Sequence, residues 1–147
     1  MFSDLKLICG SEKVELPCHR AFLSARSPVF LAMFQHDTAE AQKKEIEMPD
    51  VEPEVAERML KYIYSGHIKS IEPGTEEELL AAADKYRLLE LKEHCEVALC
   101  ERMLKETDVE TTLEMLVFAD KNSVAKLKDF CVDYLVENVQ KVFRIPG

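Results

Sequence analysis

The chain has 147 residues, of which 47% are hydrophobic and 32% charged, and its formal net charge is −9. This length and apolar content suffice for one compact domain, or for one domain with an extension. The negative charge argues against nucleic acid and anionic membrane surfaces as partners, because both repel an acidic protein. The apolar runs are too short to span a bilayer, and the N-terminus, Met1-Phe2-Ser3-Asp4, lacks a signal-peptide pattern. We therefore expect a protein of the nucleus or the cytoplasm.

Short stretches of alternating apolar and polar residues predict a small β-sheet. Residues Asp4–Cys9 and Val14–Cys18 flank the polar sequence Gly10-Ser11-Glu12-Lys13, which is typical of a β-hairpin. A third strand is predicted at Glu45–Met48, immediately before the breaker Pro49.

Helix start and stop signals divide most of the remaining chain. Ser27 and Pro28 predict an N-cap and a first helical residue for a helix over Val29–Phe34. Pro53 predicts another helix start, and Gly66 predicts the end of that helix. Two further starts are predicted as capping boxes, in which a Thr hydroxyl and a Glu carboxylate satisfy each other's amides: Thr75-Glu76-Glu77-Glu78 and Thr107-Asp108-Val109-Glu110. The three glutamates of the first box are expected to be solvated in the positive first turn.

The C-terminal half of the chain contains an internal repeat. Residues 119–121 repeat the Ala-Asp-Lys of residues 83–85, 36 positions earlier. The same shift superposes further pairs: Leu91-Lys92 on Leu127-Lys128, Cys95 on Cys131 and Leu99 on Leu135. This pattern predicts two tandem helical hairpins with the same apolar spacing.

The cysteines and the motif content indicate a chain without catalytic chemistry. All five cysteines lie inside apolar patterns and none forms a Cys-x-x-Cys pair, so we expect reduced core residues. Neither a Gly-rich phosphate loop, nor a Gly-x-Ser-x-Gly elbow, nor zinc-ligand spacing is present, and no cofactor or metal is expected. The enzymatic alternative is a small hydrolase or thiol enzyme that uses Cys18 or Cys95.

The segment between residues 22 and 34 is unusually rich in large apolar side chains. Six of them fall within about four helical turns, more than one buried face accommodates: Phe22, Leu23, Val29, Phe30, Met33 and Phe34. We expect some of them to face a partner. The alternative is a wholly buried central helical hairpin.

Six segments, in this order and spacing, resemble the successive signatures of a BTB/POZ domain. They are Phe2-Ser3-Asp4-Leu5, His19-Arg20-Ala21-Phe22-Leu23, Ala25-Arg26-Ser27-Pro28-Val29-Phe30, Ala32-Met33-Phe34, Tyr62-Ile63-Tyr64-Ser65-Gly66 and Ala81-Ala82-Ala83-Asp84-Lys85-Tyr86. Residues 107–142 resemble the helical pair, called the 3-box or the start of a BACK domain, that follows BTB in cullin-3 adaptors. The strongest resemblance is to the MATH-BTB adaptors, such as speckle-type POZ protein, although no MATH domain is present.

The resemblance implies an α+β fold in which a small β-sheet is flanked by a cluster of α-helices, with a C-terminal helical-hairpin extension. It places a BTB/POZ domain at residues 1–104 and the 3-box or start of BACK at residues 105–147. It also implies homodimerisation through the first two helices. The residues carried over to that dimer interface are Phe2, Asp4, Leu5, Arg20, Phe22, Leu23 and Phe30. Asp4 and Arg20 are expected to pair if both are buried, because an uncompensated buried charge is costly.

The implied function is that of a non-enzymatic, homodimeric substrate adaptor, which binds the cullin-3 N-terminal domain in a RING ubiquitin ligase. The cullin-binding residues carried over are Met33, Phe34, Thr38, Glu40 and Tyr86, with the helical pair after Thr107 in support. Thr38-Ala39-Glu40 occupies the family's hydrophobic-x-Glu motif, with Thr38 in place of the large apolar residue. The substrate would bind through a domain outside this chain. The alternative function is a dimerising scaffold or transcriptional-regulator POZ domain that acts without cullin.

Overall fold

The structure is a computed structural model, which describes residues 3–35, 44–68, 71 and 74–143, the last four of these by their backbone alone. The chain divides into two compact units, Met1–His94 and Cys95–Gly147. This division falls inside helix α6 (Leu89–Lys105), which also contains the boundary predicted after residue 104. No helix in the described part of the chain is long and apolar enough to cross a membrane.

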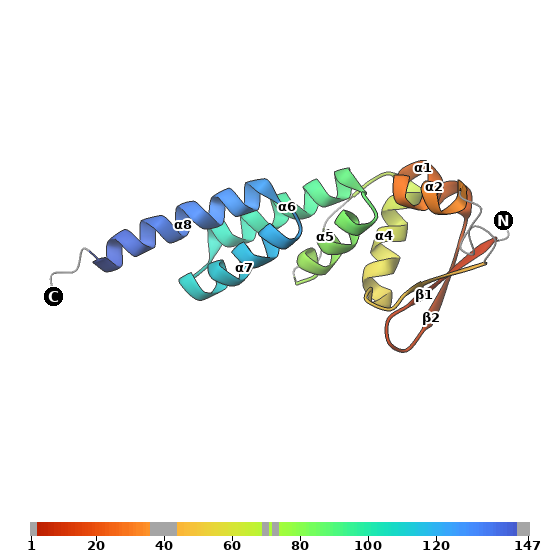
Figure 1. Cartoon of the computed structure of the whole chain (residues 1–147), viewed down its shortest axis with the longest axis horizontal. Coiled ribbons are helices and arrows are strands. Elements are labelled where there is room, and N and C mark those ends of the chain that lie inside the picture. Colours follow the sequence, from red (N-terminus) through yellow and green to blue (C-terminus); the bar gives the residue numbers. More distant parts are fainter. Residues whose placement is uncertain (1–2, 36–43, 69–70, 72–73, 144–147) are drawn as a thin grey trace. The chain divides into compact units, whose positions relative to one another are not determined.

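The first unit contains a three-stranded sheet (Figure 1). Strand β1 (Leu5–Cys9) lies in the centre, antiparallel to β2 (Val14–Cys18) and parallel to β3 (Glu45–Met48). The predicted hairpin and third strand are therefore confirmed. Helices intervene between β1 and β3, as a parallel pair requires, because its strands cannot be joined by a tight turn.

The helices of the first unit lie on both sides of β3 in the chain. Before it come α1 (Arg20–Arg26) and α2 (Pro28–Gln35), and after it come α4 (Pro53–Ser65), α5 (Glu76–Lys85) and the first turns of α6. The start signals predicted at Pro28 and Pro53 are confirmed. Gly66 ends α4 in a left-handed conformation at φ 72°, and its amide donates to the Tyr62 carbonyl over 2.7 Å. The fold class is thus α+β, as predicted.

Both predicted capping boxes are wrong in detail, although helices begin at both places. Thr75 makes no side-chain capping bond, because its backbone is near-helical (ψ −5°) rather than extended as an N-cap requires. The Gly74 amide instead donates to the Glu76 carboxylate, and Glu76 is buried rather than solvated. In the second case Asp108 is the N-cap, one residue later than predicted. Its extended backbone lets the carboxylate accept from the Thr111 amide over 2.7 Å.

The second unit contains the rest of α6 together with α7 (Val109–Lys121) and α8 (Ala125–Phe143), which pack side by side (Figure 1). Its buried apolar side chains are Cys95, Leu99, Met103, Met115, Ala119, Val124, Leu127 and Cys131. The α7 and α8 hairpin predicted from the repeat is therefore present.

The internal repeat is also a repeat of local geometry. In both hairpins an Ala carbonyl accepts from the amide five residues later over 2.8 Å, from Leu88 to Ala83 and from Val124 to Ala119. The residue preceding each of these donors is left-handed, with φ 52° at Arg87 and 56° at Ser123. An Asp–Lys ion pair of 2.8 Å then joins the two helices in each copy: Asp84 with Lys92, and Asp120 with Lys128.

Candidate interaction surface

The joint between α1 and α2 is fixed by a buried hydroxyl. Ser27 is fully buried, and its Oγ donates to the Tyr86 carbonyl over 2.6 Å. The same oxygen accepts from the Phe30 amide over 3.1 Å, which caps the first turn of α2. Because Tyr86 follows α5, this one side chain holds the start of α2 against the end of α5.

A stack of aromatic rings supports α2 from the interior of the first unit. The Phe30 and Tyr86 rings lie parallel, with centroids 4.6 Å apart and an interplanar angle of 3°. The Lys85 ammonium lies 5.6 Å from the Tyr86 centroid and forms a 2.9 Å ion pair with Asp50. The hydrogen bond from Lys85 lowers the pKa of the Asp50 carboxyl below its ordinary value. Burial, followed by the charge of Asp50, raises the pKa of Tyr86 to about 12.

The outer side of α2 leaves apolar surface exposed. Leu31 is 39% exposed, and Met33 and Phe34 are half-buried. The Arg20 guanidinium lies over the Phe34 ring, 5.3 Å from its centroid. We call these three residues, Leu31, Met33 and Phe34, the α2 edge. The Phe30–Tyr86 stack and the Ser27 bonds fix α2 from the interior of the first unit.

The residues predicted to bind cullin are only partly brought together. Met33 and Phe34 lie on the α2 edge, whereas Tyr86 is 2% exposed, so its ring supports that edge from below rather than forming its surface. Thr38 and Glu40 lie outside the described residues.

The residues predicted for the dimer interface also separate into different environments. Leu5, Leu23 and Phe30 are buried within the single chain, and Phe2 lies outside the described residues. Of the six apolar residues between positions 22 and 34, only Leu23 and Phe30 are fully buried, so the hairpin of α1 and α2 is not wholly interior.

Asp4 and Arg20 are close but not mutually buried. Asp4 is exposed, and its carboxylate accepts from the Arg20 backbone amide over 2.9 Å, which holds the start of α1 beside β1. In the single chain the carboxylate of Asp4 is therefore joined to Arg20 through the backbone amide.

An aromatic cluster beside Phe22 was not predicted from the sequence. Phe22 and Tyr64 are each 36% exposed, and their ring centroids lie 4.6 Å apart. The His19 amide donates to the Tyr64 hydroxyl over 2.9 Å, and its ring Nδ1 lies 2.9 Å from the same oxygen. Nε2 of His19 is buried and has no hydrogen-bond partner among the described residues. The Tyr-Ile-Tyr-Ser-Gly signature contained Tyr64, but its contact across 45 positions is not visible in a linear pattern.

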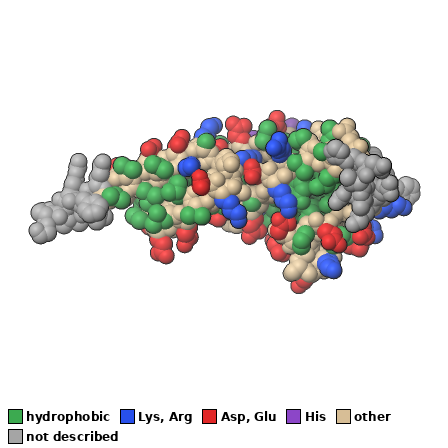
Figure 2. All heavy atoms as spheres, in the orientation of Figure 1, with side chains coloured by type: hydrophobic (Ala, Val, Ile, Leu, Met, Phe, Trp, Pro, Cys, Tyr) green, Lys and Arg blue, Asp and Glu red, His purple; other side chains and the backbone are tan. Residues whose placement is uncertain are grey.

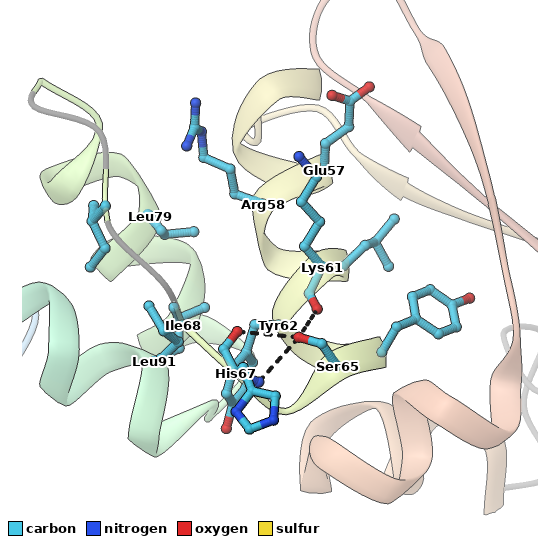
Figure 3. Close-up of a pocket in the computed structure, with 12 residues that line it drawn as sticks. Glu57, Arg58, Lys61, Tyr62, Ser65, His67, Ile68, Leu79 and Leu91 are labelled. Atoms are coloured by element: carbon cyan, nitrogen blue, oxygen red, sulfur yellow. Dashed lines mark hydrogen bonds between the residues drawn. The ribbon is translucent and has the colours of Figure 1, made fainter.

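A cavity of about 1000 Å³ lies beside α4 in the first unit (Figure 3). Arg58 and Lys61 of α4 lie across it from Leu79 and Leu91, and none of the residues predicted for a site lines it. The Ser65 hydroxyl is engaged with the carbonyls of Lys61 and His67.

The thiols have the properties of core residues. Cys9, Cys18, Cys95 and Cys131 are buried, Cys100 is half-buried, and none is in a disulfide. Burial raises the pKa of Cys18 to about 12 and that of Cys131 to about 11. Such thiols are poor nucleophiles at neutral pH. Among the described residues, no group of three or more His, Cys, Asp or Glu side chains is arranged to hold a metal ion.

Comparison with known proteins agrees with this geometry. The family model of the BTB/POZ domain matches residues 1–103. Among solved structures, the BTB domain of zebrafish PATZ1 is 26% identical, with a TM-score of 0.57 over 67% of this chain and 76% of that one. The BTB domain of human gigaxonin is 28% identical, with a TM-score of 0.54 over 64% of this chain and 75% of that one.

Proposed function

Because this chain belongs to the BTB/POZ domain family, whose members are protein-interaction modules that commonly homodimerise, we propose that it is a homodimeric substrate adaptor of a cullin-3 RING ubiquitin ligase. In this proposal the α2 edge binds the cullin N-terminal domain, together with Glu40 in the segment after α2. The chain contributes binding alone, and the ubiquitin-transfer chemistry belongs to the ligase. Two copies would present two substrate sites, which raises effective local concentration by avidity.

The α2 edge is the observation that carries the proposal. Aromatic and Met side chains are enriched where protein interfaces bury their centre, and Met33 and Phe34 are half-buried on a helix that is fixed from below. A helix that is already fixed by interior packing loses little conformational entropy on binding. The resemblance of residues 107–142 to a 3-box favours cullin over other partners.

Dimerisation is proposed to use the exposed aromatic pair of Phe22 and Tyr64. Their rings already contact each other, so a partner that covers them buries apolar area without ordering flexible chains. Asp4, fixed by the Arg20 amide, would lie at the polar margin of that interface.

The second candidate function is a dimerising scaffold, or a transcriptional-regulator POZ domain, that acts without cullin. Thr38 favours it, because the family's cullin motif has a large apolar residue at this position. Replacing such an anchor by Thr forgoes burial worth roughly 1.5 kcal/mol.

Calorimetric titration of the cullin-3 N-terminal domain into the full chain tests the proposal. Phe34→Ala and Glu40→Lys are expected to abolish or strongly weaken binding. Phe22→Ala, a matched truncation on α1, is expected to leave cullin affinity intact and to lower the mass in light scattering. Glu12→Lys, on the β1–β2 turn, is the charge-matched control for Glu40→Lys.

The outcomes separate the two candidate functions. Tight binding that is lost in both α2-region variants supports the adaptor. A folded, dimeric chain that binds no cullin would contradict the adaptor and leave the scaffold. A folded chain that is monomeric at all concentrations would contradict the dimer in either function.

A further inference from the structure

The helices of the second unit expose two apolar stripes. On α8, Val132, Val136 and Val139 recur at helical spacing and are 41%, 52% and 47% exposed. On α7, Val109, Leu113 and Val117 recur every four residues and are also exposed. Figure 2 shows hydrophobic side chains gathered on the surface of the second unit. Exposed apolar residues that recur along a helix mark an interaction site more often than scattered single residues do.

The internal repeat indicates what kind of element such a stripe accommodates. The positions on α6 that lie 36 residues before the α8 stripe are Glu96, Cys100 and Met103. Glu96 and Met103 are buried, at 9% and 3% exposure. The Glu96 carboxylate accepts from the amides of Lys126 and Leu127, at the start of α8, over 3.1 and 3.4 Å. Cys100 also contributes to the raised pKa of Cys131 on α8, after burial. The α6 copy of this face is therefore covered by a helix.

The charges beside the stripes indicate which kind of partner they would accept. Exposed acidic residues directly follow four of the stripe residues: Glu110, Glu114, Asp133 and Glu137. The lysines with described side chains on α7 and α8 lie instead where the two helices join, at Lys121, Lys126 and Lys128, and Lys128 is paired with Asp120. A second copy of this chain would bring acidic margins against acidic margins, which is unfavourable.

We propose that the stripe of α8 binds an amphipathic helix of a partner protein. This helix would carry an apolar residue at every third or fourth position and Lys or Arg on either side of that row. The apolar row would cover Val132, Val136 and Val139, and the basic margins would meet Asp133 and Glu137. The α2 edge and Glu40 take no part in this contact, although α7 and α8 fall within residues 107–142, whose 3-box resemblance supports the cullin proposal.

Fluorescence anisotropy with the full chain and a labelled synthetic helix tests this proposal. The probe is a peptide of about 18 residues, roughly five turns, with a Leu row flanked by Lys. A second peptide keeps the Leu row and replaces each Lys by Glu. We expect the basic peptide to bind, with an affinity that falls as salt rises, and the acidic peptide not to bind.

Two variants locate the site. Val136→Lys is expected to weaken binding about tenfold or more, because it removes buried apolar area and adds a like charge. Val14→Lys, the same change at an exposed position of β2, is the matched control and is expected to bind like the parent chain. Glu137→Lys keeps the apolar row intact and is expected to weaken binding several-fold at low salt and to flatten its salt dependence. Circular dichroism establishes that each variant is folded.

Several results would overturn the proposal. They are absence of binding to the basic peptide, equal binding of the acidic peptide, and equal binding by Val136→Lys and the parent chain. If light scattering shows self-association that Val136→Lys removes, the stripes are an interface between copies and the proposed basic partner is wrong.

Discussion

At the scale of single residues, the Ser27 hydroxyl bonds to two backbone groups at once. It accepts from the Phe30 amide and donates to the Tyr86 carbonyl, 59 positions away in the sequence. A buried carbonyl that loses its donor retains the full cost of its desolvation. Ser27 therefore caps α2 and also links its start to the end of α5 by a hydrogen bond.

Replacing Ser27 by Ala is expected to lower the free energy of unfolding by about 1–3 kcal/mol, because two buried backbone groups lose their partner. Ser65→Ala is the matched control. That hydroxyl is also bonded to carbonyls, but it is exposed, so water replaces the lost bonds and the change should stay within about 0.5 kcal/mol. Urea denaturation measures both. A Ser27 variant as stable as the control would show that the hydroxyl is not structural.

Cysteine reactivity is a second property decided residue by residue. Burial raises the pKa of Cys9, Cys18, Cys100 and Cys131, and only Cys100 of the five cysteines is not fully buried. Alkylation of the folded chain at pH 7, followed by peptide mass spectrometry, is expected to modify Cys100 first and the others only on unfolding. Fast modification of Cys18 or Cys95 would instead favour the thiol-enzyme alternative.

At the scale of elements, the same turn ends α5 and α7. Each turn places a residue with a side chain in the left-handed region, Arg87 in one copy and Ser123 in the other. This conformation costs roughly 1–2 kcal/mol for an L-residue and little for glycine. The ion pair that follows each turn, from Asp84 to Lys92 and from Asp120 to Lys128, joins the two helices of each copy.

Arg87→Gly and Ser123→Gly are each expected to raise the free energy of unfolding by about 0.5–1 kcal/mol, since relief of left-handed strain exceeds the added chain entropy. Ser24→Gly, inside α1, is the matched control and should destabilise by about 1 kcal/mol. Thermal denaturation compares all three with the parent chain. If both glycine variants are less stable than the parent chain, the side chains of Arg87 and Ser123 stabilise the fold by more than their left-handed backbone costs.

At the scale of the whole molecule, the groups most displaced from their ordinary pKa are buried neutral acids. The pKa of Cys18 rises from 9.0 to about 12, that of Cys131 from 9.0 to about 11, and that of Tyr86 from 10.0 to about 12. The unfolded chain releases these protons at lower pH than the folded one. Stability is therefore fully present below pH 9 and decreases as pH rises from about 9 toward 12.

Chemical denaturation between pH 7 and 11 measures this dependence. We expect the free energy of unfolding to be constant near neutral pH and to decline above pH 9. In Cys18→Ala this decline should be shallower, because one of the groups with a raised pKa is removed. Cys100→Ala is the control, since its thiol is only half-buried and should contribute less. An equal slope in the parent chain and Cys18→Ala would contradict the raised pKa.

The sequence alone determined the elements whose signals are local. The alternation in β1, β2 and β3 specified the strands, Pro28 and Pro53 specified two helix starts, and Gly66 specified a helix end. The order of short signatures was enough to identify the family, and the 36-residue spacing specified two copies of one helical hairpin.

Only the tertiary structure decided which of these residues contact one another. The parallel pairing of β1 with β3, the Ser27 bond to Tyr86 and the contact of Phe22 with Tyr64 join distant positions, so no local pattern encodes them. Backbone conformation at Thr75 likewise overrode a capping box, and burial divided the apolar residues of α1 and α2 between core and surface. The physical reason is that the hydrophobicity of a side chain sets the free energy that it gains on burial. Its packed neighbours decide whether it is buried in its own chain or left for a partner.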